Sequence, residues 1–138
     1  MSTRLVHVGP GATALEAIRR MAEAGVGSVA VCDGSRLVGI FTERDVLRLA
    51  GEAAALDQVR VEDAMTRQVA TVSPDTDLVS AARLMGKRGI RHLPVVEGDN
   101  LLGMIGIRDV LAALAERLWR SRDDDVHETV HELLARRR

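Results

Sequence analysis

The chain has 138 residues and is poor in cysteine and aromatic side chains. Its one cysteine, Cys32, cannot form an internal disulfide, which excludes a disulfide-stapled secreted scaffold. Phe41 and Trp119 are the only aromatic residues, and this scarcity argues against a nucleic-acid platform built on base stacking. Neither sign of charge dominates, since 19 Lys and Arg residues stand against 20 Asp and Glu residues. A general polyanion binder is therefore not expected.

Long apolar runs are also missing. No stretch approaches the roughly 18 apolar residues of a membrane-spanning helix, and residues 1–4 lead into no apolar core of a signal peptide. The hydrophobic share of 46% and the charged share of 28% are typical of a folded globular protein. We therefore expect a cytoplasmic protein whose partners include neither nucleic acid nor membrane.

What the sequence does contain is an internal repeat. Residues 8–47 align without gaps on residues 72–111, at an offset of 64, with 14 identical pairs among 40 positions. The clearest part of the match is the run 44–47, which falls on 108–111. So many gapless identities indicate two copies of one supersecondary unit.

Each copy predicts the order β-α-β-β-α. Thr13 and Glu16 form a capping-box pattern at the start of the first helix, and Gly25 is the stop signal at its end. The remaining elements of the first copy are expected at 5–8, 28–31, 37–41 and 42–50. Those of the second are expected at 69–72, 77–88, 92–96, 101–105 and 107–119.

Four segments follow from this pattern. We expect a first repeat at 3–50, a linker at 51–60, a second repeat with a helical lead-in at 61–118, and a C-terminal helix and tail at 121–138. The two sheets should pack about a pseudo-two-fold axis. The last helix is too short to be stable alone, and its apolar stripe must dock on its own body or on a partner chain. The stripe consists of Val126, Val130, Leu133 and Leu134.

The segment 39–45 is the most informative for chemistry. A buried strand is expected to end at Thr42, where a helix begins, and the first N–H groups of a helix attract anions. Asp45 lies one turn later on the same side, where its carboxylate can accept two bonds from a vicinal diol such as a ribose. Thr-x-x-Asp is equally a plain capping box, so both interpretations stay open. The second copy keeps Asp109 but has Gly106 in place of Thr42.

A second pattern, H-E-x-x-H, spans residues 127–131. His127 and His131 lie one turn apart on a helix with Glu128 beside them, as in zinc-dependent proteases. The pattern begins 11 residues before the end of the sequence, and Glu132 is the only acidic or histidine residue after it. We therefore expect a solvated helix face. Metal binding by His127 and His131 is a lesser alternative, and a zinc hydrolase that uses His127, Glu128 and His131 is a remote one.

The ordered set of motifs resembles a tandem pair of cystathionine-beta-synthase (CBS) domains, the Bateman module, over roughly residues 3–118. The segments that carry the resemblance are "GIFTERD", "GMIGIRD", "RHLPVVEGDNLLG" and "VEDAMTRQVATVSPDT". The resemblance implies an α/β fold of two β-α-β-β-α repeats with an added C-terminal helix. It also implies a homodimer, in which the C-terminal helix can serve as a clamp.

The resemblance further implies a regulatory role without catalysis and without a required metal. The expected ligand is an adenine nucleotide or a related adenosyl compound, namely AMP, ADP, ATP, NAD(H) or S-adenosylmethionine, held in clefts between the repeats. The ligand would change the conformation of the module, and an unidentified effector protein would respond to that change.

The family's functional residues carry over to matching positions. Asp45 and Asp109 correspond to the aspartate that holds the ribose diol, and Thr42 to the residue that contacts ribose or phosphate. The other expected contacts are Arg91 and His92 to phosphate, Arg108 beside Asp109, and the apolar surroundings of adenine near Val8 and Val72.

Each expected site departs from the family pattern. The first has Thr42, but Gly27 and Ser28 stand where the second has Arg91 and His92. The second has these basic residues but no hydroxyl at its helix start. We therefore expect one well-occupied nucleotide site and leave open which it is. The alternative is a structural dimerisation module with vestigial sites.

Overall fold

The computed structural model describes residues 5–120 and 129–135. It divides into two compact units, each with its own core. The first unit comprises the chain up to Val69 together with Asp99–Leu101, and the second comprises the remainder. Both units combine helices with strands, so the predicted α/β class is confirmed.

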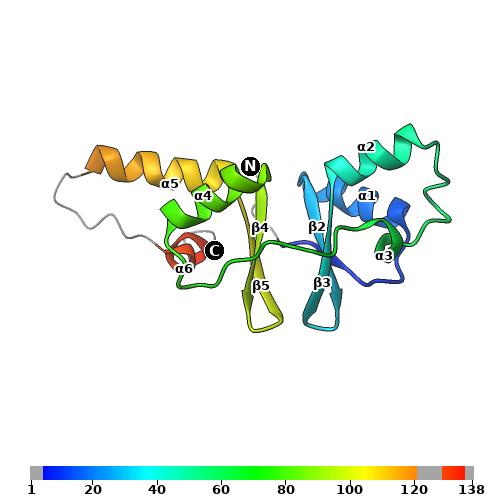
Figure 1. Cartoon of the computed structure of the whole chain (residues 1–138), viewed down its shortest axis with the longest axis horizontal. Helices are drawn as coiled ribbons and strands as arrows, with labels where there is room; N and C mark the ends of the chain where they lie inside the picture. The colour runs from blue at the N-terminus through cyan, green and yellow to red at the C-terminus, as the bar shows by residue number, and fades with distance from the viewer. Residues whose placement is uncertain (1–4, 121–128, 136–138) are drawn as a thin grey trace. The chain divides into compact units, whose positions relative to one another are not determined.

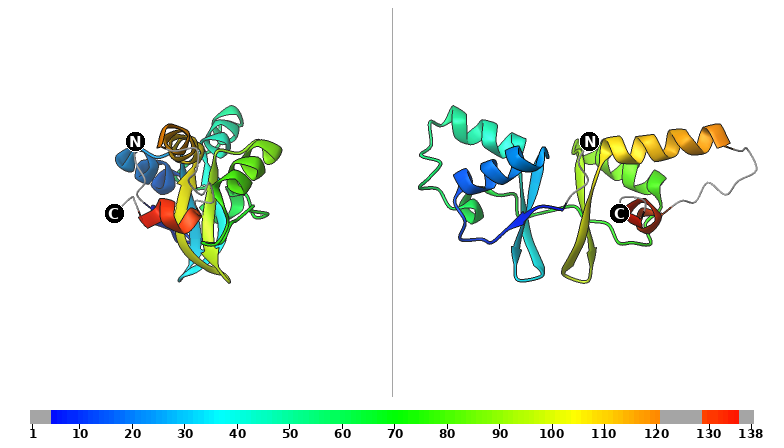
Figure 2. Two further views of the ribbon diagram at one scale, coloured as in Figure 1. Left: turned by 90° about the vertical axis from the view of Figure 1, so that its left-hand side faces the viewer. Right: turned by 180° about the vertical axis from the view of Figure 1, so that it is seen from behind.

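The first unit holds three strands and three helices. Its elements are β1 (His7–Val8), α1 (Ala14–Ala24), β2 (Ser28–Asp33), β3 (Arg36–Thr42), α2 (Glu43–Gly51) and α3 (Val61–Ala64). Strand β2 pairs in parallel with β1 and antiparallel with β3. Figures 1 and 2 show the three helices on one side of the β2–β3 hairpin. The predicted β-α-β-β-α order is present here.

The ends of α1 follow from local chemistry. The Thr13 hydroxyl accepts the backbone N–H of Glu16 at 3.1 Å, while the Glu16 carboxylate accepts the N–H of Thr13 at 3.3 Å. This reciprocal pair satisfies two N–H groups that lack partners within the helix. Gly25 ends the helix with φ +67°, a left-handed conformation that side chains with a Cβ disfavour. The predicted capping box and glycine stop are confirmed.

The core of the first unit is aliphatic except for Phe41. Phe41 is fully buried in β3, among valines from β2 and the apolar faces of the helices. Cys32 is buried in β2, as the sequence predicts for a small apolar core residue. Its burial raises the pKa of the thiol. This thiol therefore lacks the thiolate character of a redox sensor.

The second unit repeats the arrangement. Its elements are α4 (Leu78–Arg88), β4 (His92–Glu97), β5 (Asn100–Gly106), α5 (Ile107–Arg120) and α6 (Val130–Ala135). Strands β4 and β5 are hydrogen-bonded neighbours. In place of β1 the unit has a parallel bridge between Val72 and Val95, which matches the pairing of Val8 with Val31 in the first unit. Figure 1 shows α4 and α5 on the same side of the β4–β5 hairpin.

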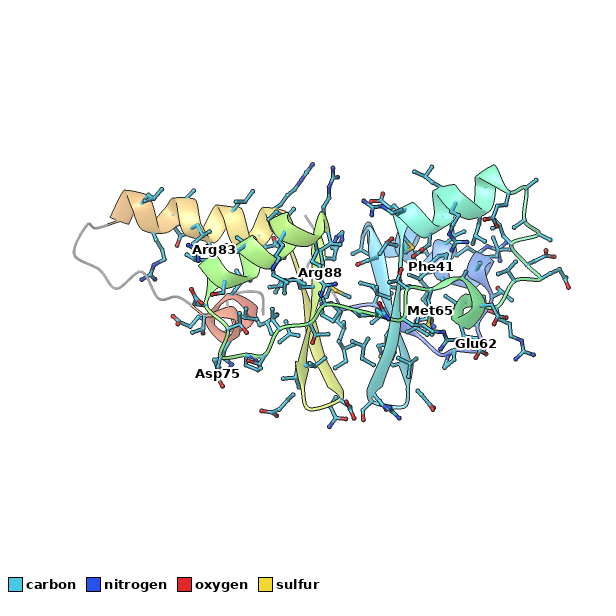
Figure 3. All side chains as sticks on the ribbon, viewed as in Figure 1. Phe41, Glu62, Met65, Asp75, Arg83 and Arg88 are labelled. Atoms are coloured by element: carbon cyan, nitrogen blue, oxygen red, sulfur yellow. The ribbon has the colours of Figure 1, made fainter. Side chains whose placement is uncertain are left out.

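Helix α3 closes the core of the first unit. The sequence predicts a helix in this place as a lead-in to the second repeat. The helix is present, and its buried side chains, Val61 and Ala64, belong to the core of the first unit. Its start is tied to the turn before α1, because the Val61 N–H donates to the Ala12 carbonyl at 2.7 Å. The next residue, Met65, packs over β3 so closely that a Cβ at Gly39 would overlap its sulfur (Figure 3).

Helix α6 has the same contacts in the second unit. The Val130 N–H donates to the Thr76 carbonyl at 2.8 Å, and a Cβ at Gly103 would lie 3.1 Å from the Leu134 side chain. Thr76 and Gly103 are the repeat equivalents of Ala12 and Gly39 at the offset of 64. The second unit is therefore closed by a short helix seated as α3 is seated in the first.

The predicted apolar stripe of the C-terminal helix docks on its own chain. Val130 and Leu133 are buried in the second core, and Leu134 packs against it. Val126 lies outside the described residues. Among the residues described, no helix is long and apolar enough to cross a membrane.

Candidate functional site

The carboxylate of Asp45 lies at the start of α2. The backbone N–H of Thr42 donates to its Oδ2 at 2.9 Å, and the Thr42 hydroxyl donates to the same oxygen at 3.4 Å. Asp45 is 7% exposed. The capping arrangement therefore exists, and it uses one of the two carboxylate oxygens. A carboxylate has about four lone-pair sites, so capping leaves acceptors for a second partner.

A cation that the sequence analysis missed stands beside Asp45. Arg48 Nη2 lies 3.6 Å from Asp45 Oδ1, and the Arg48 side chain is 46% exposed. The same Nη2 donates to the carbonyl oxygen of Ala64, the last residue of α3, at 2.7 Å. The i,i+3 spacing of Asp45 and Arg48 on a helix is the signal that sequence reasoning had available. The first-repeat site therefore contains a basic residue.

The second-repeat site gathers its residues around Gly106. A Cβ built on Gly106 would lie 3.6 Å from Asp109 Oδ2, 3.8 Å from the Arg91 carbonyl oxygen and 3.8 Å from His92 Cδ2. Asp109 is 7% exposed, like Asp45. The structure thus brings together three of the residues that the sequence predicts for one site.

The two sites share one backbone arrangement. The N–H of Ile107, the first residue of α5, donates to the Arg91 carbonyl at 2.8 Å. In the first unit the N–H of Glu43, the first residue of α2, donates to the Gly27 carbonyl at 3.1 Å. In both units the residue before the central strand therefore holds the start of the helix that carries the aspartate. Arg91 is exposed and His92 is half-buried at that place in the second unit.

The other predicted site residues fall into two groups. Arg108 is exposed on the first turn of α5. Val8 and Val72 are buried at the edge of each unit's strands, where they form part of the cores. Each therefore occupies its expected element.

The H-E-x-x-H pattern is described only at its end. His131 is exposed on α6, while His127 and Glu128 lie outside the described residues. Within residues 5–120 and 129–135, no three His, Cys, Asp or Glu side chains form a group that could hold a metal ion.

Chemically, both sites offer the same combination. Each has a buried carboxylate at a helix start and a nearby basic residue. A carboxylate accepts hydrogen bonds from hydroxyl groups, and a guanidinium pairs with phosphate. The combination therefore suits a ligand that carries both a diol and an anionic group.

Comparison with known proteins identifies the family. A sequence model described as the CBS domain matches residues 1–52 and 61–116. The chain belongs to the CBS domain family. The match comprises two copies, so this CBS protein is a tandem pair, as the sequence repeat predicts. A curated relative, the uncharacterized 17.7 kDa protein in the bps2 3' region of Acidianus ambivalens, is 38% identical over 83% of this chain and 70% of its own length.

Solved structures support the same assignment. The CBS-domain-containing protein ATU1752 from Agrobacterium tumefaciens is 35% identical with a TM-score of 0.73, over 80% of this chain and 90% of that one. The CBS domain protein PAE2072 from Pyrobaculum aerophilum, solved in complex with AMP, is 27% identical with a TM-score of 0.74. That comparison covers 84% of this chain and 95% of PAE2072. Some relatives are longer, since the chain spans only 32% of one from Thermofilum pendens.

Proposed function

We propose that this CBS-domain pair is a regulatory module that binds an adenosyl nucleotide and signals its presence to an effector protein. The observation that carries the proposal is the matched placement of Asp45 and Asp109. Each carboxylate is 7% exposed at the first turn of the helix that follows the central hairpin of its unit. The AMP complex of the related PAE2072 supports AMP as the first ligand to test.

In this proposal Asp45 and Asp109 accept the hydroxyl groups of the ribose. Thr42 supplies a hydroxyl to the first site, and Arg91 and His92 face the phosphate at the second. The remaining proposed contacts are Arg108 near phosphate and the surroundings of Val8 and Val72 near adenine. Binding and conformational change account for regulation without a catalytic step or a required metal. A ligand regulates only if it binds one conformation better than another.

The proposal is tested by isothermal titration of AMP and ATP into the wild type, Asp45→Ala and Asp109→Ala. We expect binding to the wild type and loss of that binding in at least one variant, because removing a carboxylate removes the diol's acceptors. Asp75→Ala is the matched control, since Asp75 is an exposed acid in the turn before α4 and lies on neither α2 nor α5 (Figure 3). The same titration with NADH and S-adenosylmethionine follows if AMP and ATP give no heat.

The outcomes separate the two candidate functions. Binding that is unaffected by both substitutions would contradict the proposed sites. Absence of binding for all four compounds at millimolar concentration would favour the alternative, a structural dimerisation module with vestigial sites. A thermal-shift series provides an independent reading, because a ligand at 100 times its Kd stabilises the native state by about 2.7 kcal/mol.

We also propose that the chain is a homodimer. Leu47 on α2 and Leu111 on α5 are repeat equivalents, and they are 73% and 53% exposed. Each unit therefore exposes a large apolar side chain at the same place on its second long helix, and a second copy can cover such side chains. Light scattering coupled to size exclusion should give twice the chain mass for the wild type. Leu47→Glu with Leu111→Glu should give the monomer mass, and an unchanged mass would contradict this interface.

A further inference from the structure

Arg48 contacts two structures that are far apart in the sequence. Its Nη2 lies 3.6 Å from the carboxylate of Asp45 in α2 and 2.7 Å from the carbonyl oxygen of Ala64 in α3. Its Nη1 lies 3.7 Å from the carboxylate of Glu52. One guanidinium group therefore joins the candidate ligand-binding carboxylate to the helix that closes the first unit.

Helix α3 needs this type of support. It has four residues, so its own hydrogen bonds do little to hold it in place. It is seated by tertiary contacts, including the Thr66 N–H, which donates to the Ile40 carbonyl at 2.9 Å, and Met65, which packs over Gly39. Immediately beyond Thr66 the chain runs on to the second unit, which begins at Ala70. The residues that seat α3 therefore lead directly into the segment that connects the two units.

We propose that Arg48 is the residue that couples occupancy of the Asp45 site to the seating of α3. The inference rests on the proposed function for the identity of the ligand. A diol donates to the Asp45 carboxylate and an anionic group attracts the guanidinium, so an adenosyl nucleotide competes with Ala64 for Arg48. Because 46% of the Arg48 side chain is exposed, it can turn toward a bound anion.

The position of Arg48 has no basic counterpart in the second repeat. The residue equivalent to Arg48 at the offset of 64 is Ala112, which has no cation to offer. The position equivalent to Arg48 therefore supplies no arginine to α6, the helix that closes the second unit. Ligand at Asp45 and ligand at Asp109 should consequently have different effects on the closing helices of their units.

Amide hydrogen exchange followed by NMR tests the link in two arms. Without ligand, Arg48→Ala and Asp45→Asn should each accelerate exchange of the Met65 and Thr66 amides. We expect the exchange rate to rise about tenfold or more in Arg48→Ala, because this variant loses a charge-assisted hydrogen bond, and to rise less in Asp45→Asn. When AMP is added to saturation, the exchange rates of the same amides should change in the wild type and stay the same in Arg48→Ala.

Arg67→Ala is the matched control. Arg67 Nη2 donates to the Glu62 carbonyl of α3 at 2.9 Å, and within the described residues Arg67 has no hydrogen bond or ion pair with Asp45. This variant should loosen α3 as Arg48→Ala does, while its response to AMP stays like that of the wild type. A response to AMP that persists in Arg48→Ala would overturn the coupling.

The outcomes also separate this inference from the proposed function. If AMP binds and Asp45→Asn abolishes that binding, but Met65 and Thr66 do not respond in the wild type, the function stands and the coupling is wrong. If no adenosyl compound binds, the proposed function is wrong. The exchange rates measured without ligand still test whether Arg48 links Asp45 to α3. Unchanged exchange in both ligand-free variants would overturn that link.

Discussion

The N–H of Val130 donates to the carbonyl oxygen of Thr76 at 2.8 Å, where α6 meets the turn before α4. Val61 and Ala12 make the same bond at 2.7 Å in the first unit. A second bond follows in each case, from His131 to Pro74 at 3.0 Å and from Glu62 to Pro10 at 3.3 Å. The C-terminal helix α6 thus belongs to the core of the second unit.

Removal of apolar contacts from α6 should therefore destabilise the second unit. Leu133 is 2% exposed, and Leu133→Ala should lower the free energy of unfolding by about 2–5 kcal/mol, as for other buried leucines. Denaturant unfolding followed by circular dichroism measures the change. His131→Ala is the control, because the His131 side chain is exposed and the seating bond uses its backbone. Equal stability of the two variants would contradict the docking of α6.

Two glycines at the C-terminal end of α4, one inside the helix and one just after it, should respond in opposite directions to alanine. Gly89 ends the helix with φ +65°, and Gly89→Ala should destabilise the protein by roughly 1 kcal/mol or more. Gly86 lies within the helix with open space at its Cβ position, and Gly86→Ala should stabilise it by about 0.5–1 kcal/mol. Thermal unfolding of both variants checks the signs. A stabilised Gly89→Ala would contradict the left-handed helix end.

A hydroxyl can be supplied to the second site. A Cβ at Gly106 would meet Asp109, Arg91 and His92 at ordinary contact distances, and its backbone needs no positive φ. Gly106→Ser should therefore fold normally and tighten AMP binding about 2- to 10-fold, the equivalent of one added hydrogen bond. Titration calorimetry in an Asp45→Ala background isolates this site. Unchanged binding in the serine variant would show that the ligand does not approach Gly106, and weaker binding would show that the added side chain blocks it.

The thiol of Cys32 should be slow to react at neutral pH. Its burial raises its pKa, so less thiolate is present than in an exposed cysteine. Because the pKa of Cys32 is raised in the folded state, the contribution of this thiol to the free energy of unfolding is fully present below the pKa that it has in the unfolded chain. That contribution falls as the pH rises above this value. Labelling with a thiol reagent at several pH values should therefore be slow until unfolding exposes Cys32. Fast labelling at pH 7 under native conditions would contradict this expectation.

Much of the fold could be predicted because its determinants are local. Gly25 and Gly89 end helices in the left-handed conformation, and the Thr13–Glu16 pair starts one. These signals recur at one offset, so the second copy confirms the interpretation of the first. The aspartates of the candidate site were also visible in the sequence, since each lies three residues after the last residue of the strand before its helix.

The parts that escaped prediction depend on contacts between distant segments. Arg48 and Ala64 are 16 residues apart, and nothing in the sequence near Arg48 indicates that it binds α3. The similarity of α3 and α6 was hidden because Val61 and Val130 are 69 residues apart, whereas the repeat offset is 64. Their equivalence becomes visible only through the shared backbone partners.

The matched seating of α3 and α6 has a consequence for engineering. Each copy needs a helix beyond α2 or α5 to close its core. The two copies differ by five residues in the spacing to that helix, as 69 − 64 = 5. The closing helix therefore keeps the same seat in both units although the spacing ahead of it differs. That interval is where an engineer should insert a reporter sequence, since the two copies already differ in length there.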